Sequence, residues 1–449
     1  MIAEWRASGR SVAVVGLARS GVAATLLLRD RGVPVYASDN ERGDRLEPAA
    51  AQLRAAGADV DLGRHDLGRI AAATAVVVSP GVPPDVPPLL AAAQAGVPVY
   101  AEVDLGFTEL KGTRSIAVTG TNGKTTTTAL IAHLLGAGGV RAEAAGNIGR
   151  PLCEMVRRGD APDWLALELS SFQLHDAPHI RPDVGVLTNL APNHLDRYAT
   201  LEEYYGDKAR LFANASPSSV WVTNADDSAV REMVHRVAGT HLRFSTRMRA
   251  EGWFDRSGGR LMLGDAVLLP RVELPLLGDH NVQNALAAAL AAHQAGLGPE
   301  VIGHGLRSFR AIPHRVEPVR EVDGVLWIND SKSTNVTSTE VAIAAVDRPF
   351  VLLLGGRHKG EPYGRLAPLL RERCRAVVAY GEAQPIVVKD LSGALCVVTA
   401  TTFDEVLNRA RELARPGDAV LLSPACSSYD MFDNYEQRGD RFRAAVEAF

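Results

Sequence analysis

A short glycine-rich loop near residue 120 carries the residues with the clearest chemical potential. In order, the loop consists of Gly120, Thr121, Asn122, Gly123, Lys124, Thr125 and Thr126. Glycines allow backbone N–H groups to surround phosphate oxygens, and a helix that begins at such a loop adds the positive end of its dipole. The lysine of such a loop reaches the β- and γ-phosphates of a nucleotide, and the next threonine holds Mg²⁺. The loop therefore predicts an ATP site, although Val118 stands where the common pattern has its first glycine.

The segments around this loop are suited to position it. An apolar, β-branched run precedes the loop and a helical pattern over residues 128–135 follows it, so strand, loop and helix come in the order that phosphate binding needs. Strand and helix patterns alternate along the rest of the chain as well. This alternation predicts an α/β protein with mostly parallel sheets, whose central domain resembles a P-loop ATPase.

Two further strand ends carry candidate ligands for a metal ion. Glu168 lies in the otherwise apolar strand 164–169, where a carboxylate is costly unless it meets a cation. We expect it to bind Mg²⁺ near the ATP, the alternative being a structural glutamate in a salt bridge. The strand 184–187 leads into a loop with Asn193, His194 and Asp196, and this set suits metal or phosphate chemistry.

Lysine is rare in this chain, which makes its positions informative. Of 48 basic residues only six are lysine: Lys111, Lys124, Lys208, Lys332, Lys359 and Lys389. In an arginine-rich chain a lysine indicates a place that needs a compact, modifiable amine. The alternatives are that lysine and arginine are placed at random, or that a given lysine, such as Lys208, is only a surface residue of a helix.

The first hundred residues predict a Rossmann-like domain. A buried strand over 11–15 runs into a turn from Gly16 to Gly21 that opens a helix, and a second strand ends at Asp39, about 20 residues on. A third strand over 75–78 leads into Ser79 and Gly81. A nicotinamide dinucleotide, a UDP-sugar and no ligand at all are the three interpretations of this turn. We favour the UDP-sugar, because an ATP loop follows and nothing later in the chain resembles a hydride-transfer site.

Length and composition limit the remaining possibilities. A chain of 449 residues has room for about three domains, and strand patterns at 325–328, 350–354, 376–380 and 419–422 predict a third, Rossmann-like domain at the C-terminus. The net charge of −4 disfavours nucleic-acid binding, and the four cysteines form no C-x-x-C pair that would indicate zinc or a disulfide framework. We expect a cytoplasmic protein without membrane insertion, because neither a signal peptide nor a long apolar run is present.

Several segments, taken together, resemble the Mur ligase family. In chain order they are VTGTNGKTTTT, GNIG, LELSSFQL, NHLDRY, GDHNVQNALAAA, IPHRVE, INDSKSTN, LGGRHKG, LSPACSSYDMF and EQRG. The resemblance covers essentially the whole chain, and LELSSFQL resembles the members that add D-glutamate. It implies a UDP-substrate domain over residues 1–101, an ATP domain over 102–311 and an amino-acid domain over 312–449.

The resemblance also implies a reaction and its cofactors. ATP converts the carboxylate of UDP-N-acetylmuramoyl-L-alanine into an acyl phosphate, which the amine of D-glutamate then attacks in peptidoglycan precursor synthesis. Two Mg²⁺ ions and fixed cations would counter the anions that gather at the reaction centre. The lysine at position 208 would react with CO₂ and become a carbamate, which an arginine cannot do.

Each site residue receives a role through the resemblance. For ATP these are the loop from Gly120 to Thr126, Asn281 and Asn284 for adenine, Asp330 for the ribose, and Arg315 and Lys332 for phosphate charge. For the metal ions they are Thr125, Glu168, His194 and carbamylated Lys208. The catalytic residues are Lys124, Glu168, His194 and Lys208. For the UDP-substrate they are Arg19, Ser20, Asp39, Ser79, Gly81 and Asn147. For D-glutamate they are Thr334, Lys359, Ser423 and Phe432.

The chain departs from the family pattern at a few positions, and other functions would explain part of the sequence. Asn193 stands where many members carry Asp before the histidine, and Arg19 and Ser20 occupy positions that vary in the family. A folylpolyglutamate synthase would share the ATP loop but lack the first domain. A non-catalytic UDP-sugar sensor would need neither Lys208 nor Lys359. Mur ligases for other amino acids differ chiefly in the last domain.

Overall fold

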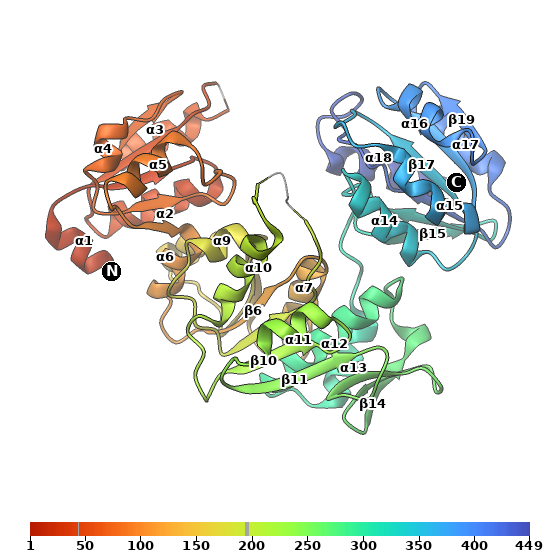
Figure 1. Ribbon diagram of the computed structural model, residues 1–449, viewed down its shortest axis with the longest axis horizontal. Helices are drawn as coiled ribbons and strands as arrows, with labels where there is room; N and C mark the ends of the chain where they lie inside the picture. The colour runs from red at the N-terminus through yellow and green to blue at the C-terminus, as the bar shows by residue number, and fades with distance from the viewer. Residues whose placement is uncertain (44, 194–196) are drawn as a thin grey trace. The chain divides into compact units, whose positions relative to one another are not determined.

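The computed structural model describes residues 1–43, 45–193 and 197–449 and separates the chain into two compact units (Figure 1). The first unit contains residues 1–271 and 283–306, and the second contains residues 272–282 and 307–449. The first unit holds two sheets and the second unit holds one. No helix of the described chain is long and apolar enough to cross a membrane.

The first sheet has five parallel strands in the order β3-β2-β1-β4-β5. The strands are β1 (Val12–Val15), β2 (Val35–Asp39), β3 (Asp59–Leu62), β4 (Val76–Val78) and β5 (Val99–Ala101). The helices are α1 (Ile2–Ser8), α2 (Arg19–Asp30), α3 (Glu47–Ala55), α4 (Leu67–Ala71) and α5 (Pro87–Gln94). Alternate residues of β1 belong to two different core clusters, so both faces of this sheet are covered.

The second sheet has nine strands in the order β14-β13-β12-β11-β10-β9-β6-β8-β7. Its strands are β6 (Arg114–Thr119), β7 (Ala142–Gly146), β8 (Trp164–Glu168), β9 (Val184–Leu187), β10 (Val220–Asn224), β11 (Thr240–Ser245), β12 (Gly252–Asp255), β13 (Arg260–Leu263) and β14 (Ala266–Pro270). Neighbours from β7 to β12 run parallel, and β12, β13 and β14 run antiparallel.

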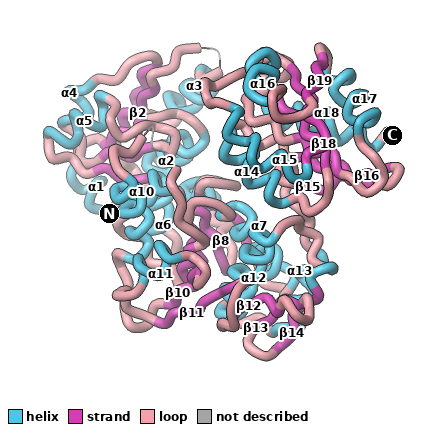
Figure 2. Tube along the Cα trace, turned by 45° about the vertical axis from the view of Figure 1, so that its right-hand side comes forward, coloured by secondary structure: helices cyan, strands magenta, loops and turns pink. Residues whose placement is uncertain are grey.

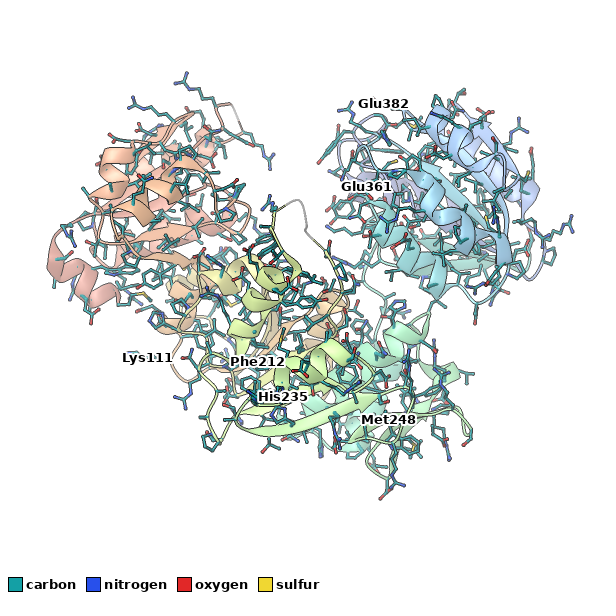
Figure 3. The ribbon with its side chains drawn as sticks, viewed as in Figure 1. Lys111, Phe212, His235, Met248, Glu361 and Glu382 are labelled. Atoms are coloured by element: carbon teal, nitrogen blue, oxygen red, sulfur yellow. The ribbon has the colours of Figure 1, made fainter. Side chains whose placement is uncertain are left out.

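Helices precede and follow the strands of this second sheet. They are α6 (Glu102–Glu109), α7 (Lys124–Ala137), α8 (Leu152–Arg158), α9 (Ser171–His175), α10 (Leu201–Ala209), α11 (Ser228–Val234), α12 (Asp279–Gln294) and α13 (Pro299–Ser308), with short 3-10 turns η1 (Arg210–Phe212) and η2 (Arg271–Glu273). Phe212, labelled in Figure 3, packs edge-on against Trp221 with ring centroids 4.8 Å apart, and both side chains are buried.

The third sheet has six strands in the order β15-β16-β20-β17-β18-β19, all parallel except the antiparallel pair β15 and β16. The strands are β15 (Glu317–Val322), β16 (Val325–Asn329), β17 (Phe350–Gly355), β18 (Cys374–Tyr380), β19 (Val397–Ala400) and β20 (Ala419–Leu422). The helices are α14 (Val336–Ala345), α15 (Ala367–Arg373), α16 (Gln384–Leu391), α17 (Phe403–Leu413) and α18 (Tyr435–Glu447), with the 3-10 turn η3 (Tyr363–Leu366).

The three sheets confirm the predicted α/β class with mostly parallel strands. Figure 2 shows the strands together with the helices. In β17, Leu352 and Leu354 belong to one core cluster and Val351 and Leu353 to the other. Parallel strands buried on both faces read as continuous apolar runs, which is why the strand segments were visible in the sequence. The carboxyl ends of such strands are where ligands bind in this kind of fold.

Candidate active site

The glycine-rich loop lies between the end of β6 and the start of α7, as predicted. Gly120 and Gly123 have positive φ angles of 143° and 80°. A Cβ at Gly120 would stand 2.0 Å from Thr188 Oγ1, and one at Gly123 would stand 2.2 Å from Asn284 Oδ1. Both positions therefore require glycine.

Residues that follow β9 hold the loop in place through hydrogen bonds. Thr188 Oγ1 donates to the Asn122 carbonyl at 2.7 Å, and the Asn122 N–H donates to Asn189 Oδ1 at 2.9 Å. The Thr121 N–H donates to the Asn189 carbonyl at 2.8 Å. Thr188 and Asn189 were not among the predicted site residues, because they are about 70 positions from the loop and join it only in the folded sheet.

Two lysine amines converge on one carbonyl oxygen of this loop. Lys124 Nζ donates to Gly120 O at 3.0 Å and to Thr121 O at 2.8 Å. Lys208 Nζ, from α10, donates to the same Gly120 O at 2.7 Å and lies 4.6 Å from the centre of the Tyr204 ring. Two ammonium groups at one acceptor repel each other, and no described carboxylate forms an ion pair with Lys208.

Lys208 is therefore not a surface lysine. Its side chain is 1% exposed, and burial, with the charge of Lys124 added, lowers the pKa of its amine to about 6. A lysine in this state is largely neutral near pH 7 and can act as a nucleophile.

Glu168 ends β8 beside the strand that enters the loop, and Val118 is its partner in the sheet. The residue is 2% exposed. Its Oε1 accepts from Asn147 Nδ2 at 2.9 Å, while its Oε2 has no hydrogen-bond partner among the described residues. The alternative of a salt-bridged structural glutamate finds no support in the described ion pairs, and a buried carboxylate with a free oxygen suits a cation.

The remaining predicted metal and adenine residues are placed as follows. Thr125 is in the first turn of α7. His194 lies outside the described residues, whereas the nearby Tyr198 donates to Asp207 Oδ2 at 3.0 Å. Asn284 Oδ1 accepts from Thr127 Oγ1 at 3.3 Å. Asn281 Nδ2 donates to the Leu277 carbonyl at 2.8 Å.

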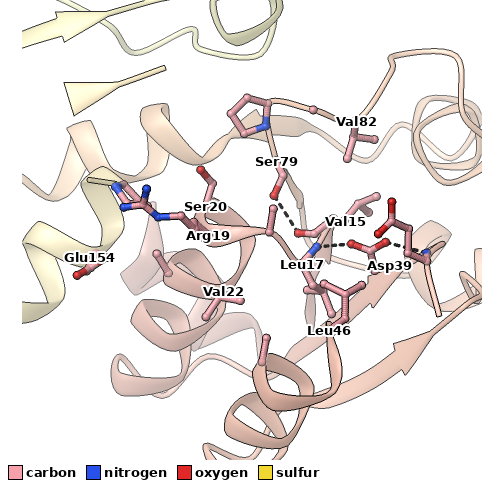
Figure 4. A pocket seen from close by; sticks show the side chains of 18 of the residues that line it. Val15, Leu17, Arg19, Ser20, Val22, Asp39, Leu46, Ser79, Val82 and Glu154 are labelled. Atoms are coloured by element: carbon pink, nitrogen blue, oxygen red, sulfur yellow. Dashed lines mark hydrogen bonds between the residues drawn. The ribbon is translucent and has the colours of Figure 1, made fainter. Parts of the chain in front are cut away.

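A cavity of about 1330 Å³ adjoins the ends of β1, β2 and β4 in the first unit (Figure 4). All six residues predicted for the UDP-substrate line it: Arg19, Ser20, Asp39, Ser79, Gly81 and Asn147. Asp39 accepts the Leu17 N–H at 2.6 Å and the Glu41 N–H at 2.9 Å, and Ser79 Oγ donates to Gly16 O at 2.8 Å. Both side chains thus shape the turn that opens α2.

Basic residues that the sequence analysis missed also line this cavity. They are Arg45, Arg157 and Arg158, and His65 lies with them. With Arg19, four arginines line the cavity beside three acidic residues, Asp39, Glu41 and Glu154, and Arg158 forms an ion pair with Glu154 at 2.9 Å. Guanidinium groups are suited to bind a diphosphate. Arg157 also forms a 2.6 Å ion pair with Asp30, which joins α8 to the end of α2.

In the second unit, Asp330 and Ser423 form a buried pair. Asp330 accepts the Val316 N–H at 3.1 Å and Ser423 Oγ at 2.7 Å, and Ser423 Oγ also lies 3.0 Å from Thr339 Oγ1. Burial raises the pKa of Asp330 to about 6. The Ser423 hydroxyl is fully buried and already engaged, so a part in D-glutamate binding would have to run through Asp330.

The other residues predicted for D-glutamate lie on different parts of this unit. Thr334 is half-buried and Lys359 is exposed. Phe432 packs edge-on against Phe403 at 5.0 Å and lines a separate cavity beside α17. The structure thus does not bring Phe432 and Ser423 to one surface. Lys332 Nζ lies 3.8 Å from the centre of the Tyr435 ring, a cation–π partner that the sequence analysis missed.

Comparison with known proteins agrees with the geometry. The family model described as "Mur ligase middle domain" matches residues 118–292, "Mur ligase, glutamate ligase domain" matches 314–426, and "Mur ligase MurD-like, N-terminal domain" matches 10–101. UDP-N-acetylmuramoylalanine–D-glutamate ligase from Acidobacterium capsulatum is 41% identical over 446 residues, which are 98% of this chain and 96% of that protein. The protein of the same name from Salinibacter ruber is 42% identical over 452 residues, or 97% of each chain. The chain belongs to the Mur ligase family.

Solved structures show that this Mur ligase shares its fold with other members. MurF from Acinetobacter baumannii matches with a TM-score of 0.61 at 18% identity, covering 91% of this chain and 90% of that chain. UDP-N-acetylmuramate-alanine ligase from Thermotoga maritima matches with a TM-score of 0.58 at 20% identity, covering 98% and 99%. The resemblance found in the sequence is confirmed, and so is the three-domain α/β fold that it implied.

Proposed function

We propose that this Mur ligase joins D-glutamate to UDP-N-acetylmuramoyl-L-alanine, with hydrolysis of ATP to ADP and phosphate, in peptidoglycan precursor synthesis. The observation that carries this proposal is the near full-length identity of about 40% to ligases that bear this name. On the same basis residues 1–101 bind the UDP-substrate, residues 102–311 bind ATP and residues 312–449 bind the amino acid.

The reaction proceeds in two steps. A carboxylate oxygen of the alanyl group attacks the γ-phosphorus of ATP, and the bond to the β-phosphate oxygen breaks to release ADP. The amine nitrogen of D-glutamate then attacks the acyl carbon, loses a proton and expels phosphate. Lys124 and the backbone N–H groups of the loop hold the phosphates, because the loop is shaped by glycines that no larger residue could replace.

The residues around Glu168 fit a magnesium ion. Its Oε2 is buried and has no hydrogen-bond partner in the described part of the chain. Its Oε1 is oriented by Asn147, and Thr125 lies in the first turn of the adjoining helix. Mg²⁺ supplies charge neutralisation for the phosphates when it is bound. We assign Thr125 and Glu168 to a first magnesium ion, and His194 with modified Lys208 to a second.

The convergence of Lys124 and Lys208 supports a carbamate on Lys208. The neutral Nζ attacks the carbon of CO₂ and loses a proton, which leaves an –NH–COO⁻ group. This change puts an anion at a position where a second cation would repel Lys124, and the nitrogen keeps one N–H for the Gly120 carbonyl. The new carboxylate is an oxygen ligand of the kind that Mg²⁺ prefers.

The cavity of the first unit suits the UDP-substrate. The twelve-residue helix α2 begins at Arg19 and has no side-chain cap, so its first N–H groups are available for the diphosphate. Asn147 lines the same cavity and donates to Glu168, so we assign it to the muramoyl-alanine arm of the ligand. Thr334 and Lys359 are the residues that we assign to the carboxylates of D-glutamate.

An isotope-transfer experiment tests the proposed reaction. UDP-N-acetylmuramoyl-L-alanine labelled with ¹⁸O in its alanyl carboxylate is turned over with ATP and D-glutamate, and the released phosphate is analysed by mass spectrometry. We expect one ¹⁸O atom in each phosphate, because the attacking oxygen leaves with it. Unlabelled phosphate at full turnover would contradict the acyl-phosphate route.

A further inference from the structure

Arg438, in the EQRG segment near the start of α18, is a fully buried arginine. Its Nε donates to Ser331 Oγ at 2.9 Å, and its Nη2 donates to Ser331 O at 2.9 Å and to Cys426 O at 3.2 Å. One guanidinium group thus joins two segments that are 107 and 12 positions away along the chain.

Both of these segments adjoin residues that the proposed function uses. Ser331 precedes Lys332, and its hydroxyl donates to the Tyr435 carbonyl at 2.8 Å. The ring of Tyr435 in turn lies 3.8 Å from Lys332 Nζ. Cys426 begins the turn toward Ser427, whose carbonyl accepts the Arg357 N–H at 2.8 Å, close to Lys359 along the chain.

Arg438 forms no ion pair with a described carboxylate, although the charge of Asp430 acts on the same buried groups, Tyr380 and Cys426. Its three acceptors are neutral oxygens, and Nη1 has no hydrogen-bond partner among the described residues. A Cβ on Gly356 would lie 3.2 Å from Nη1, so the glycine turn after β17 passes directly over the guanidinium. The buried Tyr380 Oη lies beside this charge and is a further neutral neighbour of the guanidinium.

A buried cation without a counter-ion is costly, because removal from water is not repaid by an ion pair. Inside protein, where the dielectric constant is low, such a charge attracts anions more strongly than it would through water. The two chain turns over Arg438 lead to Lys332 and Lys359, which we assign to phosphate and carboxylate. A substrate anion would supply the missing negative charge.

We propose that Arg438 is a positioning residue of the ligase reaction: it holds the turns at Ser331 and Cys426 together and adds a buried positive charge behind the turns that lead to Lys332 and Lys359. This inference rests on the proposed function of Lys332 and Lys359. Arg438 itself does not touch the substrates, since its side chain is covered on all sides.

Two substitutions distinguish the geometric role of Arg438 from its electrostatic role. Arg438→Lys keeps the charge and loses the forked contact to Ser331 and Cys426, whereas Arg438→Gln loses the charge and keeps one donor. Arg409→Gln is the control, because Arg409 lies on α17 in an exposed ion pair with Glu412. Steady-state kinetics, calorimetric binding of the UDP-substrate and melting temperature are measured for all four proteins.

We expect both Arg438 variants to raise the KM for D-glutamate by about tenfold or more, with a larger effect for Gln, and to weaken ATP binding. The affinity for the UDP-substrate stays at the wild-type value, because its cavity lies in the other compact unit. The control matches wild-type in every measurement. A wild-type KM for D-glutamate and a wild-type ATP affinity at lowered melting temperature would overturn the proposal.

Ser331→Ala provides a second test if the Arg438 variants do not fold. It removes one acceptor of the guanidinium and the bond to the Tyr435 carbonyl while leaving the arginine in place. The KM for D-glutamate is expected to rise in this variant as well, and an unchanged KM together with unchanged ATP affinity would refute the positioning role. If the wild-type enzyme does not use D-glutamate, the proposed function is wrong. The ATP affinity of the variants alone then tests the positioning role of Arg438.

Discussion

The state of Lys208 offers the sharpest single perturbation of this site. A lysine amine whose pKa falls from 10.5 to about 6 is neutral in about nine molecules of ten at pH 7, against about three in ten thousand for an exposed lysine. The difference between the charged and neutral forms corresponds to roughly 6 kcal/mol as an upper bound. An arginine side chain stays protonated, so Lys208→Arg places a permanent positive charge next to Lys124.

We therefore expect Lys208→Arg to lose about 100-fold or more of the turnover rate, because a metal-facing anion is replaced by a cation. Lys208→Ala loses a similar amount but regains part of its rate when short carboxylates are added, since acetate or formate can enter the vacated space. The assay is phosphate release in the presence of both substrates. Removal of CO₂ from the buffer slows the wild-type enzyme reversibly and leaves the two variants unchanged.

If Lys208 serves only as a donor to the Gly120 carbonyl, the results differ. Lys208→Arg would then keep most of its activity, because a guanidinium also donates to a carbonyl. A near wild-type rate for Lys208→Arg would refute the carbamate and leave the second magnesium ion to His194 and water.

Three further perturbations test separate parts of the structure. Lys124→Ala should abolish turnover and leave the calorimetric affinity for the UDP-substrate within about twofold; a parallel loss of both would refute the separate sites. Asn147→Ala should raise the Mg²⁺ concentration needed for half-maximal phosphate release about tenfold, because Glu168 loses its only described donor. Burial raises the pKa of Glu102 from 4.5 to about 7, so the folded state binds this proton more tightly and stability falls as pH rises from about 4.5 to 7. Glu102→Gln should reduce this pH-dependent loss of folding stability by up to about 3 kcal/mol. Identical pH profiles of the melting temperature for the variant and the wild type would contradict this expectation.

Sequence reasoning succeeded where local pattern carries the information. Gly120 and Gly123 could be assigned from the strand, loop and helix around them, and the structure shows that neither position has room for a side chain. Glu168 stood out because a carboxylate in an apolar strand is costly. Its Oε2 has no hydrogen-bond partner among the residues that the structure describes, which agrees with that argument. The six residues predicted for the UDP-substrate line one cavity, because the carboxyl ends of parallel strands meet at one edge of a sheet; their role in binding stays a prediction.

Sequence reasoning missed what depends on contacts between distant segments. Lys208 meets Gly120 across 88 positions, so its burial and its proximity to Lys124 could not be seen in a helix pattern. Ser423 and Asp330 are 93 positions apart, and their buried bond shows that the serine is already engaged. Tyr435 under Lys332 and Thr188 under the loop were missed for the same reason.

The acceptor specificity of the wild-type enzyme tests the central claim most directly. Phosphate release with UDP-N-acetylmuramoyl-L-alanine and ATP is measured against D-glutamate, L-glutamate, D-aspartate, L-alanine, a diamino acid and D-alanyl-D-alanine. The account predicts that D-glutamate has by far the highest kcat/KM and that release depends on all three substrates. A comparable kcat/KM for the diamino acid, or release without the UDP-substrate, would contradict it.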